Sequence, residues 1–104
     1  MNAFGYPVYE PVGRALLEAA ESVDDLTGTS EAEIEDFFGL AAGVVRDGEI
    51  RILRYQSTRC SVAFFLYPDA AGRRAVAFGK YEWNAPSRAN ARSCLLSLAK
   101  HQRK

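Results

Sequence analysis

The middle of the chain carries two runs rich in β-branched and aromatic residues, at positions 49–56 and 59–67, separated by the polar pair 57–58. A third run, 74–83, follows the turn-forming stretch 68–72. Apolar runs of this length joined by short polar turns are typical of antiparallel strands. In the second run, both alternating faces are apolar, which indicates a central strand buried on both sides. The pattern predicts a three-stranded antiparallel meander.

The pair Asp47-Gly48 lies between β-branched residues and is a strong hairpin signal, because a type I′ turn needs positive φ at both central positions. It favours a short strand at residues 44–46 ahead of the main sheet. In the third run, strict alternation would place Val76 and Phe78 on one face. Gly79 in the same run indicates a β-bulge.

Helical spacing of apolar residues predicts helices before and after these runs. The first begins at Pro11 and ends near residues 26–29, with a stripe made by Val12, Leu16, Ala19, Ala20 and Val23. The second is short, opens with a capping box between Ser30 and Glu33, and ends at Gly39. The last opens near residues 84–87 and has a buried stripe of Ala91, Cys94, Leu95 and Leu98.

Residues 1–9 show no periodicity, and we expect an extended N-terminal arm ahead of a single domain spanning residues 10–104. A chain of 104 residues has room for one modest core. The predicted fold class is α+β. Two N-terminal helices pack on a three-stranded antiparallel meander, with a C-terminal helix, in the order α-α-β-β-β-α.

The net charge is zero, but the two halves of the chain are oppositely charged. Residues 1–50 carry eleven acids against Arg14 and Arg46, whereas residues 51–104 carry eleven bases against Asp69 and Glu82. One interpretation is that a helical layer and a sheet layer attract each other. The other is a basic surface for an anionic partner such as lipid headgroups, nucleic acid or an acidic protein.

Residues able to support catalysis or metal binding are not grouped in any known signature. His101 is the only histidine and follows Cys94 by about two helical turns, too far for a hydrogen bond along one helix. Adjacent acids such as Asp24-Asp25 point in different directions on a helix, as expected of a solvated face. We therefore predict a protein that is not an enzyme and holds no cofactor or metal.

Cys60 and Cys94 lie 34 residues apart, which is not a metal-site spacing. Both fall on stripes predicted to face the core. They are either two buried thiols or one disulfide.

Aromatic residues at strand positions could belong to the core or to a surface. If the sheet face opposite the helices is open, they would form an aromatic patch beside basic side chains, which is a plausible binding surface. The candidate binding residues are Arg51, Arg54, Tyr55, Lys80, Tyr81 and Trp83, with Tyr67 as a further aromatic neighbour.

The first seven residues have neither a basic stretch nor an apolar stretch of a signal peptide. No apolar run approaches the roughly 20 residues that span a bilayer. These features suit a cytoplasmic protein or the mature domain of an exported one.

Between residues 23 and 98, short motifs follow one another in a set order. They are Leu26-Thr27-Gly28-Thr29-Ser30-x-x-Glu33-Ile34-x-x-Phe37-Phe38-Gly39, Arg46-Asp47-Gly48-Glu49-Ile50-x-Ile52-Leu53-x-Tyr55 and Cys60-x-x-x-Phe64-Phe65-Leu66-Tyr67, with a later Cys94. This order resembles the SmpA/OmlA (BamE-like) family of small envelope lipoproteins.

The resemblance implies two helices packed on a three-stranded sheet, a role in binding rather than catalysis, and a disulfide between Cys60 and Cys94. We therefore expect a non-enzymatic binding or scaffold module of the bacterial cell envelope, accessory to outer-membrane or envelope assembly. It would act in the periplasm or at the periplasmic face of the outer membrane, with a protein partner and with anionic lipid as a further candidate ligand. The alternative is a cytoplasmic interaction or regulatory protein that binds nucleic acid or an acidic protein through its basic C-terminal half.

Overall fold

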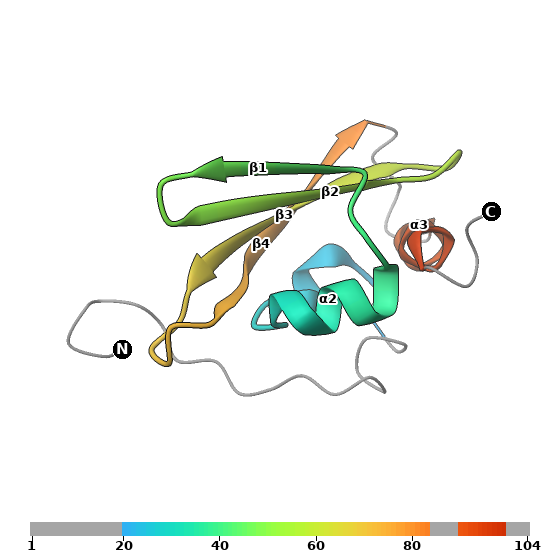
Figure 1. The fold of residues 1–104 in the computed structure, drawn as a ribbon. Coiled ribbons are helices and arrows are strands. Elements are labelled where there is room, and N and C mark those ends of the chain that lie inside the picture. The colour runs from blue at the N-terminus through green and yellow to red at the C-terminus, as the bar shows by residue number, and fades with distance from the viewer. Residues whose placement is uncertain (1–19, 84–89, 100–104) are drawn as a thin grey trace.

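The computed structural model describes residues 20–83 and 90–99 (Figure 1). Its centre is a four-stranded antiparallel sheet in which the spatial order follows the chain: β1 (Gly43–Asp47), β2 (Ile50–Gln56), β3 (Ser61–Pro68) and β4 (Arg74–Trp83). The helical elements are the 3₁₀ turn η1 (Val23–Leu26), α2 (Glu31–Phe38) and α3 (Ala91–Leu98). Figure 1 shows α2 and α3 on the same side of the sheet, so the described residues form a two-layer α+β arrangement.

The fold class predicted from the sequence was wrong in its count of strands and N-terminal helices. The segment before the meander is a full strand, since all five residues of β1 pair with β2. Ser22 is extended (φ −153°, ψ 169°), so no helix passes through it, and Val23–Leu26 forms only a 3₁₀ turn. The Asp25 carboxylate closes this turn by accepting from the amides of Glu21 and Ser22. The predicted arm and residues 11–19 of the predicted first helix lie outside the described residues.

The hairpin between β1 and β2 is confirmed, with its turn one residue later than predicted. Asp47 still pairs with Ile50, so Gly48 and Glu49 form the turn. Gly48 has a φ of +63°, which favours glycine at this position.

Gly79 does not form the predicted bulge, because it pairs directly with Phe64. The register of β3 and β4 shifts on either side of it and leaves Ala77 and Glu82 as the extra residues of β4. Gly79 instead allows η1 to approach the sheet. A Cβ at this position would lie 3.0 Å from the Cβ of Val23.

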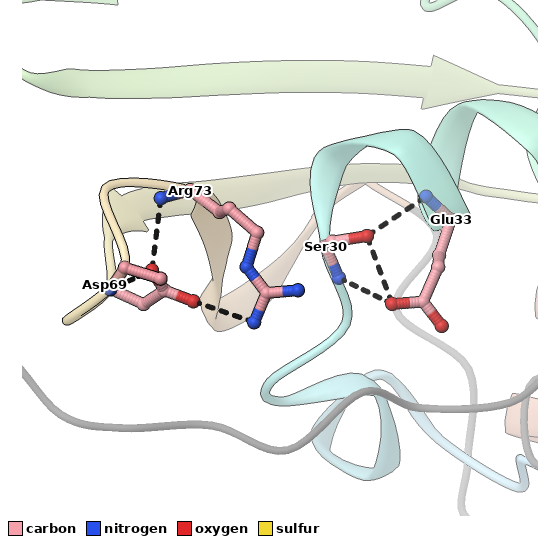
Figure 2. Close-up of polar contacts among 5 residues, drawn as sticks. Ser30, Glu33, Asp69 and Arg73 are labelled. Carbon is pink, nitrogen blue, oxygen red and sulfur yellow. Dashed lines mark hydrogen bonds and ion pairs between the residues drawn. The ribbon is translucent and has the colours of Figure 1, made fainter.

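The capping box of α2 is present as predicted (Figure 2). The Glu33 amide donates to Ser30 Oγ at 3.2 Å, and the Glu33 carboxylate accepts from the Ser30 amide and hydroxyl at 3.2 and 2.9 Å. The helix ends at Gly39 (φ 84°), and its apolar face is buried through Ile34, Phe37 and Phe38. Local signals therefore set both ends of this short helix.

The core lies between the helices and one face of the sheet, which we call the covered face. Its largest buried sheet side chains come from β2 and β3: Leu53, Tyr55, Val62, Phe64 and Leu66. Phe38 of α2 packs between Tyr55 and Phe64, with ring centroids 5.5 Å from each. The buried Tyr55 hydroxyl donates to the Gly39 carbonyl at 2.7 Å, which offsets the loss of water around it.

A disulfide between Cys60 and Cys94 ties α3 to the start of β3, with Cα atoms 5.8 Å apart. This confirms the pairing that the family resemblance implied.

The predicted buried stripe of α3 is also confirmed, since Ala91, Cys94, Leu95 and Leu98 are all buried. Polar contacts add to this attachment: Ser57 and Ser97 share a hydroxyl hydrogen bond of 2.7 Å, and Arg59 donates to Ser93 Oγ at 3.1 Å. The predicted opening of this helix at residues 84–87 lies outside the described residues.

The β3–β4 turn is closed by the buried carboxylate of Asp69 (Figure 2). It accepts from the amides of Ala71 and Arg73 at 2.9 Å each and from the Arg73 guanidinium at 3.2 Å. Burial alone would raise the pKa of Asp69, but these hydrogen bonds and the Arg73 charge bring the pKa below its ordinary value.

None of the described helices is both long enough and apolar enough to cross a membrane.

Candidate binding surface on the open face of the sheet

The sheet face that points away from η1, α2 and α3, here called the open face, carries a row of large apolar side chains. The strand registers place Val45, Ile52, Phe65 and Phe78 side by side, one from each strand. The Phe65 and Phe78 rings stack with centroids 4.4 Å apart, and Tyr67 lies 6.5 Å from Phe78. Val45 is 46% exposed and Phe78 is 43% exposed. Large apolar side chains gathered at such exposure are typical of interaction surfaces.

The next row along the open face is polar. It contains Arg54 and Lys80 on either side of the small residue Ala63. Arg54 Nε donates to Glu82 Oε1 at 2.8 Å, and this hydrogen bond, together with the Glu82 charge, raises the pKa of Arg54 above its ordinary value. Lys80 is exposed and forms no salt bridge with any other described residue.

A shallow depression of about 360 Å³ lies where the apolar and polar rows meet. Its walls combine aliphatic, aromatic and charged groups, from Val45, Ile52, Arg54, Ala63, Phe65, Lys80 and Glu82. A smaller depression of about 270 Å³ lies beside the β1–β2 turn, next to Ile50 and Tyr67. The open face is therefore apolar and contoured, with Arg54, Lys80 and Glu82 at one end and the acidic residues Asp47 and Glu49 at the other.

The structure separates the binding residues named from the sequence. Arg54 and Lys80 share the open face, whereas Arg51, Tyr55 and Tyr81 occur at positions of the covered face. Arg51 forms an ion pair with Glu31 of α2. The side chain of Trp83, the last residue of β4, lies outside the described residues.

Tyr81 is half-buried against the core. The pKa of its hydroxyl is raised above the ordinary value, mainly by burial. The Val23 backbone lowers this pKa, and the charges of Asp24 and Asp25 add smaller increases. Tyr55 is fully buried. These two tyrosines therefore serve packing, and the aromatic groups on the open face are phenylalanines and Tyr67.

Sequence reasoning missed the apolar row because it placed Phe78 with Val76. The bulge at Ala77 turns these two residues to opposite faces, since Val76 pairs with the buried Leu66 and Phe78 with Phe65. The available signal was the double-sided apolar pattern of residues 50–55, in which Ile50 and Ile52 alternate with Leu53 and Tyr55.

The basic residues of the second half mostly serve intramolecular contacts. Within the described part of residues 51–104, each basic side chain except Lys80 contacts an acceptor inside the chain, and we call these six side chains the structural bases. The contacts are Arg51 with Glu31, Arg54 with Glu82, Arg59 with Ser93, Arg73 with Asp69, Arg74 with the Glu49 carbonyl, and Arg92 with the Ala20 carbonyl. Among these contacts, only Arg51 with Glu31 is an ion pair between the acidic first half and the basic second half.

Within residues 20–83 and 90–99, no group of three or more His, Cys, Asp or Glu side chains is placed to hold a metal ion. Comparisons with protein-family models, with curated proteins and with solved structures found no match.

Proposed function

We propose that this protein is a non-enzymatic binding module that docks a partner protein on the open face of its sheet. The observation that carries the proposal is the apolar row Val45–Ile52–Phe65–Phe78 on the face away from the helices, in which Val45 and Phe78 are exposed and Ile52 and Phe65 are partly buried. A buried apolar centre with a polar rim is the usual anatomy of a protein interface. The stacked Phe65 and Phe78 rings would supply the central anchors.

The chemistry of the open face suits a partner with an apolar surface and an adjacent acidic group. Lys80 borders the apolar row and forms no salt bridge with another described residue, since the nearby Glu82 carboxylate pairs with Arg54. A carboxylate of the partner would form an ion pair with Lys80. Such a pair gives orientation and specificity more than affinity. A polyanion is less well matched, because the structural bases are already engaged within the chain.

The bacterial cell envelope is the proposed location, at the periplasmic side of the outer membrane. The Cys60–Cys94 disulfide supports it, because such bonds persist in oxidising compartments and are rare in the cytosol. The resemblance to small envelope lipoproteins points the same way and favours an accessory role in envelope assembly. A cytoplasmic protein with nucleic acid as its ligand remains the competing proposal, and it would need both thiols free.

Site-specific photo-crosslinking in the envelope of a bacterial host tests the proposal. A photoreactive phenylalanine analogue replaces Phe78 on the open face or, as the matched control, Leu96, which is exposed on α3. We expect one discrete protein adduct from position 78 that weakens with Lys80→Glu, and none from position 96. Equal labelling from both positions, or none from position 78, would contradict docking on this face.

Vesicle binding separates the protein partner from an anionic surface. We expect no difference between neutral and anionic vesicles at low salt. The contrary result is binding to anionic vesicles whose affinity falls as added salt shortens the Debye length to about 8 Å, and falls again on charge reversal at Arg54 and Lys80. In that case the open face recognises lipid, and the proposed protein partner is wrong.

A further inference from the structure

The two edges of the sheet differ in how their backbone groups are used. On β4, Val76 exchanges hydrogen bonds of 2.8 Å with Gly28 and Thr29, and Ser30 forms a bridge with Ala75. On β1, the edge away from β2 makes no backbone hydrogen bond to any residue within 20–83 or 90–99. A bare edge strand is a template for pairing with another strand.

The bare edge is also unusually apolar. Among the described residues, the large hydrophobic side chains that are most exposed include Leu40 at 84%, Val44 at 53% and Val45 at 46%. All three lie on β1 or in the segment that leads into it. Proteins usually protect an edge with charges, proline or a bulge along the strand, whereas the charges of β1 stand only at its end, on Arg46 and Asp47.

The residues of β1 are complementary to a second copy of themselves. In an antiparallel pairing centred on Val45, the two Val45 side chains face each other, Val44 faces Arg46, and Gly43 faces Asp47. No like charges stand opposite each other, and the aliphatic part of Arg46 covers the exposed Val44. All five residues of β1 are paired in this register.

The neighbouring registers are worse. Moving the centre to Arg46 brings the two guanidinium groups opposite each other, and moving it to Val44 leaves only three residues of each strand paired. Both of these changes shift the pairing by two residues and keep the faces matched. A pairing shifted by a single residue, with Val44 opposite Val45, would set the open face of one copy against the covered face of the other. The pattern of β1 therefore selects one isologous arrangement with a two-fold axis perpendicular to the sheet.

We propose that two copies of this chain associate through their β1 edges in the register centred on Val45. The two four-stranded sheets then become one continuous sheet, with both sets of helices on the same side. The rows Val45–Ile52–Phe65–Phe78 of the two copies meet at Val45 and form one apolar strip across the dimer. The proposed docking surface thereby doubles in length, with one Lys80 toward each end.

The first test is sedimentation of the oxidised full chain and of two matched variants. Val44→Lys and Val44→Glu remove the same apolar contact, but the lysine faces Arg46 of the second copy whereas the glutamate pairs with it. We expect the wild type and Val44→Glu to dimerise and Val44→Lys to raise the dimer dissociation constant at least tenfold. The double variant Val44→Lys/Arg46→Glu restores the attraction and should recover most of that loss.

The second test fixes the register through cysteine pairing. Val45→Cys places two thiols opposite each other across the axis, where Cα separations of about 4.5–5.5 Å suit a disulfide. Val44→Cys is the control, because its opposite residue is Arg46. Mild oxidation should link Val45→Cys into a covalent dimer at least tenfold faster than Val44→Cys, with the Cys60–Cys94 bond intact.

A monomeric wild type would overturn the proposal, as would a dimer on which Val44→Lys and Val44→Glu act alike. Preferential linkage of Val44→Cys would overturn the register. Val44 is not on the open face, so the Phe78 adduct of the proposed function can persist when dimerisation fails, and the two proposals fail separately.

Discussion

Phe64 and Phe65 are adjacent in β3, yet the two faces of the sheet give them different surroundings. Phe64 is fully buried between Phe38, Tyr55 and the bare backbone of Gly79. Phe65 stacks on Phe78, which is itself 43% exposed. Similar apolar composition on the two faces therefore has different consequences, because only one face has a second layer.

The covered face is built for stability and the open face is suited to contact. Burial of apolar surface stabilises by about 25 cal/mol per Å², so side chains under α2 and η1 contribute far more than those in solvent. The apolar residues of the open face bury less surface and therefore contribute less to the free energy of folding. Substitutions on the two faces should thus separate folding from binding.

The largest contrast is expected between Phe64→Ala and Phe65→Ala. Phe64→Ala leaves a cavity in the core and should lower the free energy of unfolding by roughly 3–5 kcal/mol. Phe65→Ala removes a partly buried ring and should lower the free energy of unfolding by about 1 kcal/mol. Denaturant melts measure both values, and a loss below about 1 kcal/mol for Phe64→Ala would mean that the faces are reversed.

Removal of the disulfide tests how α3 is held against the covered face. The bond closes a loop across a sequence separation of 34 residues, and the double variant Cys60→Ser/Cys94→Ser should lose roughly 3–4 kcal/mol in the chain-entropy model. The wild type should show a similar loss on adding reductant, whereas the double variant should not respond to it. Thiol counting by intact mass, on protein purified without reductant, should find no free thiol.

Gly79→Ala tests the close approach of η1 to the covered face. The new methyl group would meet Val23 Cβ at 3.0 Å and Phe64 Cδ1 at 3.4 Å, and overpacking of this kind costs roughly 1–3 kcal/mol. Val23→Gly in the same chain removes the Cβ that the new methyl group meets at 3.0 Å, so the double-mutant cycle should give a favourable coupling energy. Strict additivity of the two losses would contradict the contact.

The smallest expected effect comes from Asp69, whose turn belongs to neither face. Its pKa is lowered in the folded state, so its contribution to stability is present above the unfolded pKa of about 3.9 and is lost as the pH falls through the lower folded value. Asp69→Asn should cost about 1 kcal/mol at neutral pH. The difference from wild type should shrink in melts below about pH 4, while Phe65→Ala should keep the wild-type pH dependence.

Local features of the sequence determined the local structure. Ser30, Glu33 and Gly39 set the ends of α2 because capping involves atoms only a few residues apart. The Asp47-Gly48 pair located the first hairpin to within one residue. The stripe that includes Cys94 identified the buried side of α3, and the cysteine pairing followed from the family resemblance.

The full length of β1, the extent of η1 and the membership of the two faces were decided only in the tertiary structure. Alternation shows that Arg51, Leu53 and Tyr55 share a face, but not that α2 would cover that face and turn two of the predicted binding residues inward. The bulge at Ala77 depends on pairing between β3 and β4, so no pattern within β4 could place Phe78 beside Phe65. Periodicity records which residues lie together on one element, whereas burial depends on which other element packs against them, and that contact joins segments far apart in the chain.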